Sequence, residues 1–203
     1  MYDSGVSASS YISEIKSEAD ISTDIPDSSF LRWINAVEQF IYTEIIDERV
    51  AHETAYTSVQ NNKIPLSGVT PPTGCAIPSY DDVKEIYCDG EELEKSGVSA
   101  LATFPDKAVF YSDYAGNVVI NPTFTPKKVK IIYTIRPELK TSQTSGNIKM
   151  PIEFLDIVGA RMRGEAYKIA NEDGLAAKWL ADYNNQLESL KVWASERNSR
   201  YGK

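Results

Sequence analysis

The N-terminal quarter of the chain carries a helical pattern of apolar residues. An apolar face around residues 8–19 predicts a short amphipathic helix. Beyond residue 30 the apolar positions recur at steps of three and four as far as Ile45, which predicts a second amphipathic helix through about residue 50. We expect Asp27 or Ser28 to be its N-cap, because a side-chain oxygen there accepts hydrogen bonds from first-turn amides.

Residues 56–138 have the composition of strands and turns. They are rich in proline, glycine and asparagine, and in β-branched and aromatic residues. Asp89-Gly90 predicts a turn into a strand at Glu91–Leu93, and residues 114–117 predict a second hairpin turn. Further strands are expected near Ala55–Val59, Val83–Cys88, Ala108–Tyr111, Asn117–Ile120 and Lys128–Ile135.

Residues 61–80 are irregular and contain four prolines. They show no packing pattern, so we expect a long loop or arm. Either this stretch orders against a neighbouring subunit, or it is a plain surface loop.

The last part of the chain predicts a helical hairpin. A polar linker at 139–149 leads to Met150-Pro151, where proline suits a helix start. A second helix is expected from Asp173, and the short connection predicts antiparallel packing of the two. Residues 196–203 have no apolar stripe and are predicted to be a tail.

These elements predict an α+β fold. The N-terminal helix and the C-terminal antiparallel helical hairpin form a helical bundle, with a central β-rich insertion. The segments are 1–55, 56–138 and 139–203, and the helical parts pack together in one composite domain.

Composition and charge reduce the number of possible function classes. Of the 203 residues, 42% are hydrophobic and 25% charged, which fits a globular protein rather than a disordered one. The net charge is -8, and residues 1–55 hold 11 acidic and 3 basic residues, while the rest hold 18 of each. A sequence-specific DNA reader and a membrane-surface protein are disfavoured, because both need a basic surplus. With no secretory signal or membrane-spanning segment expected, the protein should work in the cytosol or in a particle assembled there.

The side chains that could carry chemistry are sparse. Cys75, Cys88 and His52 are the only cysteines and histidine, too few and too widely spaced for a zinc site or a catalytic triad. We therefore expect no enzyme, cofactor or metal. Acidic pairs could serve glycoside hydrolysis or bind a cation, but they are expected to be solvated turn residues: Asp81-Asp82, Glu91-Glu92 and Glu172-Asp173. The tryptophans are expected to be packing anchors: Trp33, Trp179 and Trp193.

The order of these elements resembles a known family. The segments that carry the resemblance are Leu31–Asn35 (LRWIN), Val83–Gly90 (VKEIYCDG), Val129–Tyr133 (VKIIY), Met150–Leu155 (MPIEFL) and Ala177–Tyr183 (AKWLADY). Together they look like the head-to-tail adaptor (connector) proteins of tailed bacteriophages.

The resemblance implies a structural virion protein at the head-tail junction, assembled in the host cytoplasm. Such adaptors form a homo-oligomeric ring, usually of twelve members, that binds the portal protein and presents a surface to tail proteins. DNA passes through the lumen without sequence-specific binding. An acidic surplus suits a wall along which DNA slides, although a run of charge is more often just a solvated face.

Basic and aromatic residues at the chain end are candidate portal-docking residues, since arginine and tyrosine are enriched in interface hot spots: Arg197, Arg200, Tyr201 and Lys203. The alternative is a frayed terminus. Two other function classes stay open. One is a non-catalytic accessory binding module of the tail or capsid that forms no ring, and the other is an enzyme of unrecognised type.

Overall fold

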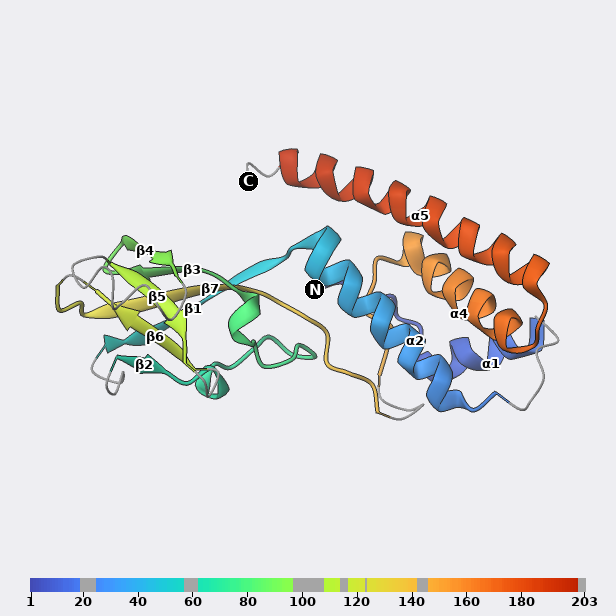
Figure 1. Cartoon of the computed structure of the whole chain (residues 1–203), viewed down its shortest axis with the longest axis horizontal. Coiled ribbons are helices and arrows are strands. Elements are labelled where there is room, and N and C mark those ends of the chain that lie inside the picture. The colour runs from blue at the N-terminus through green and yellow to red at the C-terminus, as the bar shows by residue number, and fades with distance from the viewer. Residues whose placement is uncertain are drawn as a thin grey trace. The chain divides into compact units, whose positions relative to one another are not determined.

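The structure is a computed structural model in which two compact units are distinguished (Figure 1). The helical unit consists of Met1–Ile46 and Pro137–Lys203, and the sheet unit of Asp47–Arg136. The described residues are 1–18, 25–56, 62–96, 108–113, 117–122, 124–141 and 146–200, with side chains described as far as Arg197.

The helical unit is built on a long C-terminal helix pair. Its elements are α1 (Ala8–Glu18), α2 (Asp27–Phe40), a π-helical segment (Ile41–Ile46), a 3-10 turn (Ile152–Phe154), α4 (Leu155–Ile169) and α5 (Asp173–Arg200). A short turn containing Asn171, at φ 60°, reverses the chain so that α4 and α5 run antiparallel side by side (Figure 1). Helix α2 packs on α4, and α1 contacts both. The α+β class is confirmed, and the arrangement of these helices as a bundle stays a prediction.

Helix α2 differs from its prediction at both ends. Pro26 occupies the N-cap position and Asp27 is already helical, so the predicted side-chain cap is wrong. The α-helix ends at Phe40 and continues as a π-helical segment only to Ile46. Asp47 then adopts a left-handed backbone, at φ 42°. The chain leaves the helix here because the next residues pair with a strand far along the sequence, which a local pattern does not reveal.

Two glycines of α4 allow neighbouring helices to approach closely. A Cβ on Gly164 would lie 2.8 Å from the Cγ and Cδ2 atoms of Leu180 on α5. A Cβ on Gly159 would collide with the hydroxyl of Tyr11 on α1. The absence of a side chain at these positions therefore sets the spacing of α4 from α5 and from α1.

The sheet unit contains, in the described residues, a curled sheet of seven strands in the order β1-β7-β3-β4-β5-β6-β2 (Figure 1). The strands are β1 (Arg49–Ala55), β2 (Lys63–Ile64), β3 (Val83–Cys88), β4 (Glu91–Lys95), β5 (Val109–Ser112), β6 (Val118–Asn121) and β7 (Lys128–Thr134). All neighbours are antiparallel except β4 and β5. Val129, Ile131 and Tyr133 of β7 are buried on one face, as their alternation predicted.

Most of the predicted strands are confirmed. The predicted β3 matches residue for residue, and Asp89-Gly90 turns the chain from β3 into β4, both residues at positive φ. The strand expected at 55–59 is instead β1, which precedes it at Arg49–Ala55, and residues 57–59 lie outside the described residues. The turn expected at 114–117 falls between the antiparallel strands β5 and β6, but residues 114–116 lie outside the described part as well.

The segment 61–80 packs more than its sequence suggested. β2 lies within it and pairs with β6. Its apolar residues enter the core: Ile64, Leu66, Val69 and Cys75. The prediction that this segment has no packing pattern was therefore wrong. Its apolar residues lie between the prolines and reach the core, although their spacing has the period of neither a strand nor a helix.

A buried ion pair joins the two halves of the helical unit. Glu38 on α2 and Lys140 on the returning chain are 1% and 6% exposed, and the Lys140 Nζ donates to both carboxylate oxygens, at 2.6 Å to Oε1. The backbone amide of Lys149 donates to Oε1 as well, at 2.6 Å. Burial raises the pKa of the Glu38 carboxyl above its ordinary value, while the Lys140 ammonium opposes that rise.

Side-chain amides of α2 bind the backbone of the returning chain beside this pair. Asn35 accepts from the Lys140 amide and donates to the Lys140 carbonyl, each at 2.9 Å. Gln39 donates to the Pro137 carbonyl at 2.6 Å. One face of α2 thus satisfies backbone polar groups of the returning segment at Pro137 and Lys140.

Removing one member of the ion pair should destabilise the protein more than replacing both. Lys140→Met leaves a buried carboxylate without its cation, which costs about 3–5 kcal/mol of unfolding free energy. In Glu38→Gln/Lys140→Met the amide oxygen still accepts from the Lys149 amide, so we expect a smaller loss of about 1–2 kcal/mol. Urea unfolding of the wild type and the two variants measures both losses of unfolding free energy. Equal losses would contradict the pairing.

Candidate functional site

Two of the predicted docking residues, Arg197 and Arg200, lie on a helix that is longer than expected. The tail predicted at 196–203 is wrong as far as Arg200, because α5 extends through that residue. Arg197 lies on this last part of α5, and its side chain is half-buried. The side chain of Arg200 and the residues Tyr201 and Lys203 lie outside the described part of the structure.

An aromatic cluster holds the C-terminal part of α5. The Trp193 ring makes edge contacts with the rings of Tyr2 and Phe154, at centroid distances of 5.6 Å and 5.5 Å. The Arg197 guanidinium lies over the Tyr2 ring at 5.1 Å and over the Trp193 ring at 5.9 Å. These contacts come from residues far from α5 in the sequence. They fix the end of the helix although α5 has no continuous apolar stripe here.

The start of the chain is fastened beside this cluster. Ser4 donates its amide to the Ile148 carbonyl at 3.1 Å, and the Ile148 amide donates to Val6 at 2.9 Å. The Asp3 carboxylate accepts from the Lys149 ammonium at 2.6 Å and from the Gly5 amide at 2.9 Å. The bond from Lys149 is the chief reason that the pKa of Asp3 falls to about 2.

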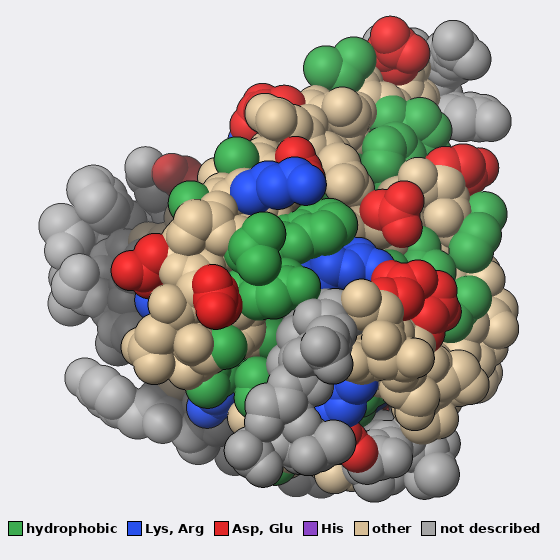
Figure 2. Space-filling view, turned by 90° about the vertical axis from the view of Figure 1, so that its right-hand side faces the viewer, with side chains coloured by type: hydrophobic (Ala, Val, Ile, Leu, Met, Phe, Trp, Pro, Cys, Tyr) green, Lys and Arg blue, Asp and Glu red, His purple; other side chains and the backbone are tan. Residues whose placement is uncertain are grey.

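Cations of α4 stack on aromatic rings of α5. The Arg163 guanidinium lies 4.8 Å from the Trp179 ring centre and also pairs with Glu18 of α1. The Arg161 guanidinium lies 5.4 Å from the Tyr183 ring. Figure 2 shows hydrophobic side chains gathered between lysine or arginine side chains on one face of the molecule, with acidic ones beside them. Trp179 and Trp193 thus pack within the helical unit, as predicted.

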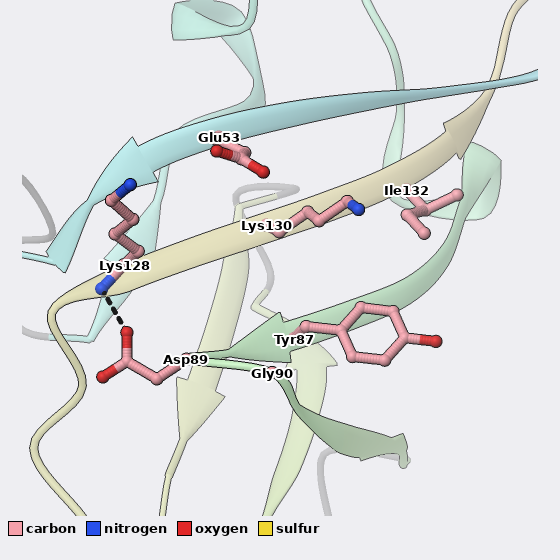
Figure 3. Close-up of a pocket in the computed structure, with 7 residues that line it drawn as sticks. All are labelled: Glu53, Tyr87, Asp89, Gly90, Lys128, Lys130 and Ile132. Atoms are coloured by element: carbon pink, nitrogen blue, oxygen red, sulfur yellow. Dashed lines mark hydrogen bonds between the residues drawn. The ribbon is translucent and has the colours of Figure 1, made fainter.

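The sheet unit has a hollow of about 420 Å³ on the solvent-facing side of the strands β1, β7 and β3 (Figure 3). Its lining residues are Glu53, Tyr87, Asp89, Gly90, Lys128, Lys130 and Ile132. The Asp89 carboxylate accepts from the backbone amides of Lys127 and Lys128, so it stabilises the start of β7. Two ammonium and two carboxylate groups around one tyrosine suit contact with a protein surface better than a defined small-molecule reaction.

The acidic and cysteine side chains that the sequence offered as candidates for chemistry have structural roles or are buried. Asp82 is buried, accepts from Ser79 and pairs with Arg136 at 2.7 Å, so it caps a turn. Burial raises the pKa of the Cys88 thiol to about 11, which keeps it protonated near neutral pH. Among the residues that the structure describes, no group of histidine, cysteine, aspartate or glutamate is placed to hold a metal ion.

The Asp3 contact should make stability depend on pH in the acid range. Since its folded pKa of about 2 lies below the ordinary 3.8, its contribution is complete above about pH 5 and is lost as the pH falls toward 2. The side chain is 46% exposed, so solvent screening limits the contribution to about 0.5–1 kcal/mol. Asp3→Asn should lower the unfolding free energy by that amount at pH 7 and by clearly less at pH 2, where the folded carboxyl is half protonated. The exposed Glu153→Gln is the control, and a difference as large at pH 2 as at pH 7 would contradict the assignment.

The comparisons with known proteins identify the family. The family model described as SU10 adaptor protein matches residues 6–202, nearly the whole chain. No curated protein matches the sequence. The match covers both units and confirms the resemblance to phage head-to-tail adaptors. On this evidence the chain belongs to the SU10 adaptor protein family.

Proposed function

We propose that copies of this chain form a ring at the head-tail junction of a tailed phage, between the portal and the tail. The observation that carries the proposal is the match of an adaptor family over residues 6–202. The family supports a structural protein of the phage virion, assembled in the host cytoplasm and acting without catalysis or a cofactor. The ring, its copy number of about twelve and its channel are expectations taken from the resemblance.

The shape of α5 supports lateral packing between copies. Its 28 residues correspond to a length of about 42 Å. Its exposed side carries small residues near both of its ends: Ala177, Ala181 and Ser195. A long helix with small side chains on its outer side allows close approach of a neighbour, and a ring needs two different surfaces that meet from copy to copy.

The charge of the chain supports a channel through which DNA slides. The net charge of -8 opposes tight phosphate binding, because fixed negative charge repels the DNA backbone. DNA would then pass through the lumen without sequence-specific recognition.

The end of α5 supports a docking role for the chain terminus. The contacts of Arg197 with Tyr2 and Trp193 fix the helix a few residues before its end. Arg200, Tyr201 and Lys203 come next in the sequence, and arginine and tyrosine are enriched at interface hot spots. We infer that these three residues, with Arg197 as their anchor, bind the portal protein.

The second candidate is a non-catalytic accessory module of the tail or capsid that forms no ring. The hollow on the sheet, with its mixed charges and tyrosine, favours it as a surface for another protein. None of the described helices is both long and apolar enough to cross a bilayer.

Imaging of the native phage particle tests the ring directly. We expect density for this chain in several symmetric copies between portal and tail, with the channel on the common axis. A single copy, or a position on the capsid or tail surface, would favour the accessory module.

Shortening the chain after Arg197 tests the docking residues. The variant keeps the contacts of Arg197 with Tyr2 and Trp193, so its thermal unfolding should match the wild type. We expect about tenfold weaker binding to portal-containing heads, measured by co-sedimentation, because hot-spot residues contribute a large share of binding energy. Lys191→Ala, which removes an exposed base of α5, is the control for charge alone. Unchanged binding of the shortened chain would refute the docking role.

A further inference from the structure

Strand β1 is a long edge of the sheet in the described residues. It is the outermost strand beside β7, spans Arg49–Ala55, and none of its side chains is fully buried. Natural sheets protect an edge by shortening it, by a bulge, by placing proline or charged side chains on it, or by covering it. The opposite edge β2 has only two residues and is followed by Pro65. Strand β1 has seven residues and no proline, and its protection against indiscriminate pairing consists of the exposed charges Arg49 and Glu53.

The register with β7 shows which backbone groups of β1 face outward. The Ile135 amide donates to the Glu48 carbonyl, and the Tyr56 amide donates to the Lys127 carbonyl. In an antiparallel ladder the bonded residues alternate, so the even-numbered residues of β1 bond to β7. The odd-numbered ones point their amides and carbonyls away from the sheet, and the described residues offer them no partner: Arg49, Ala51, Glu53 and Ala55.

The side chains of these outward positions are self-complementary. We propose that the β1 strands of two copies pair antiparallel about a two-fold axis through Ala51. Arg49 of each copy then lies directly opposite Glu53 of the other, and the two Ala51 residues face each other. The two sheets become one continuous sheet across the dimer.

Other registers are less favourable. An axis through Glu53 would place two carboxylates opposite each other, and an axis through His52 would place Arg49 opposite Ala55. Opposite charges directly across a strand pair stabilise it, and like charges destabilise it. The charges therefore select the Ala51 axis.

Arg49 has hydrogen-bonding capacity left for this contact. It donates from Nε and Nη2 to Asp47 and from Nη1 to Glu85, at 2.7–2.9 Å. A guanidinium has five N–H donors, so two remain. These contacts hold Arg49 on the same face of the strand as Glu53, which is exposed and has no ion pair in the described structure.

The proposed dimer goes beyond the ring and does not depend on it. A two-fold contact uses one surface on both copies, whereas ring neighbours meet through two different surfaces. Pairing would cover the edge of the unassembled protein and so oppose aggregation. One strand pair buries less than a standard interface, so we expect a dissociation constant in the micromolar range or weaker.

Symmetric disulfide crosslinking of the full chain tests the register. Opposite Cα atoms in the bonded pair lie about 5.5 Å apart, within disulfide reach, so Ala51→Cys should crosslink to a dimer under mild oxidation. Ala55→Cys is the matched control, because its two copies would lie about 26 Å apart along the strands. The native cysteines are both buried. Equal crosslinking of the two variants, or none at Ala51→Cys, would overturn the proposal.

Sedimentation at rising protein concentration tests the energetics. The wild type should show a concentration-dependent increase in mass. Ala51→Pro removes only an outward amide and should abolish it, while Ala55→Pro, outside the paired segment, should preserve it. Glu53→Arg places arginines opposite each other and should weaken the dimer about tenfold. A wild type that stays monomeric, or an Ala51→Pro variant that still dimerises, would exclude the edge pairing. Imaging of the native particle tests the ring independently of this experiment.

Discussion

The helical unit depends on fastening a chain segment that returns after the whole sheet unit. Glu38 and Lys140 form this attachment, and the Asn35 and Gln39 amides bind the backbone beside it. Two buried charges are costly to desolvate, and each is tolerable only with the other in place. The pair therefore contributes specificity of placement more than net stability. If the returning segment were displaced, both charges would lose their partners, so the correct closure is strongly favoured over nearby alternatives.

Elements with a strong local period could be read from the sequence. The alternation in β7 and the Asp89-Gly90 turn after β3 both recur in the structure, because a buried face and a positive φ leave local signals. The role of Glu38 could not be derived in the same way. Its position on the apolar stripe of α2 was visible, but its partner Lys140 is 102 residues away. A charged residue on an apolar stripe thus indicates that a buried partner of opposite charge exists. The sequence does not indicate which residue that partner is.

The misassigned elements share a physical cause, which is tertiary pairing that overrides local pattern. The helix was expected through about residue 50, but Arg49 and Val50 already belong to β1, which pairs with β7. The end of α5 lacks an apolar stripe, yet Tyr2 and Phe154 pack on Trp193, and the helix extends into the expected tail as far as Arg200. For the candidate docking residues, the sequence indicated only that arginine and tyrosine, residue types common at interfaces, are present near the end of the chain. The structure added that Arg197 is held by aromatic rings from both ends of the chain.

The surfaces proposed for assembly belong to different units and obey different symmetry. In the proposed ring, contacts along α5 would repeat from copy to copy and close, whereas the proposed β1 contact would join two copies and end there. An edge dimer cannot propagate around a ring, so copies in one ring would either release it or use it to reach a copy outside that ring. Release is energetically accessible because a single strand pair is weak, and a growing ring would draw monomers from the dimer by mass action. A weak edge contact can therefore protect the unassembled chain without preventing assembly.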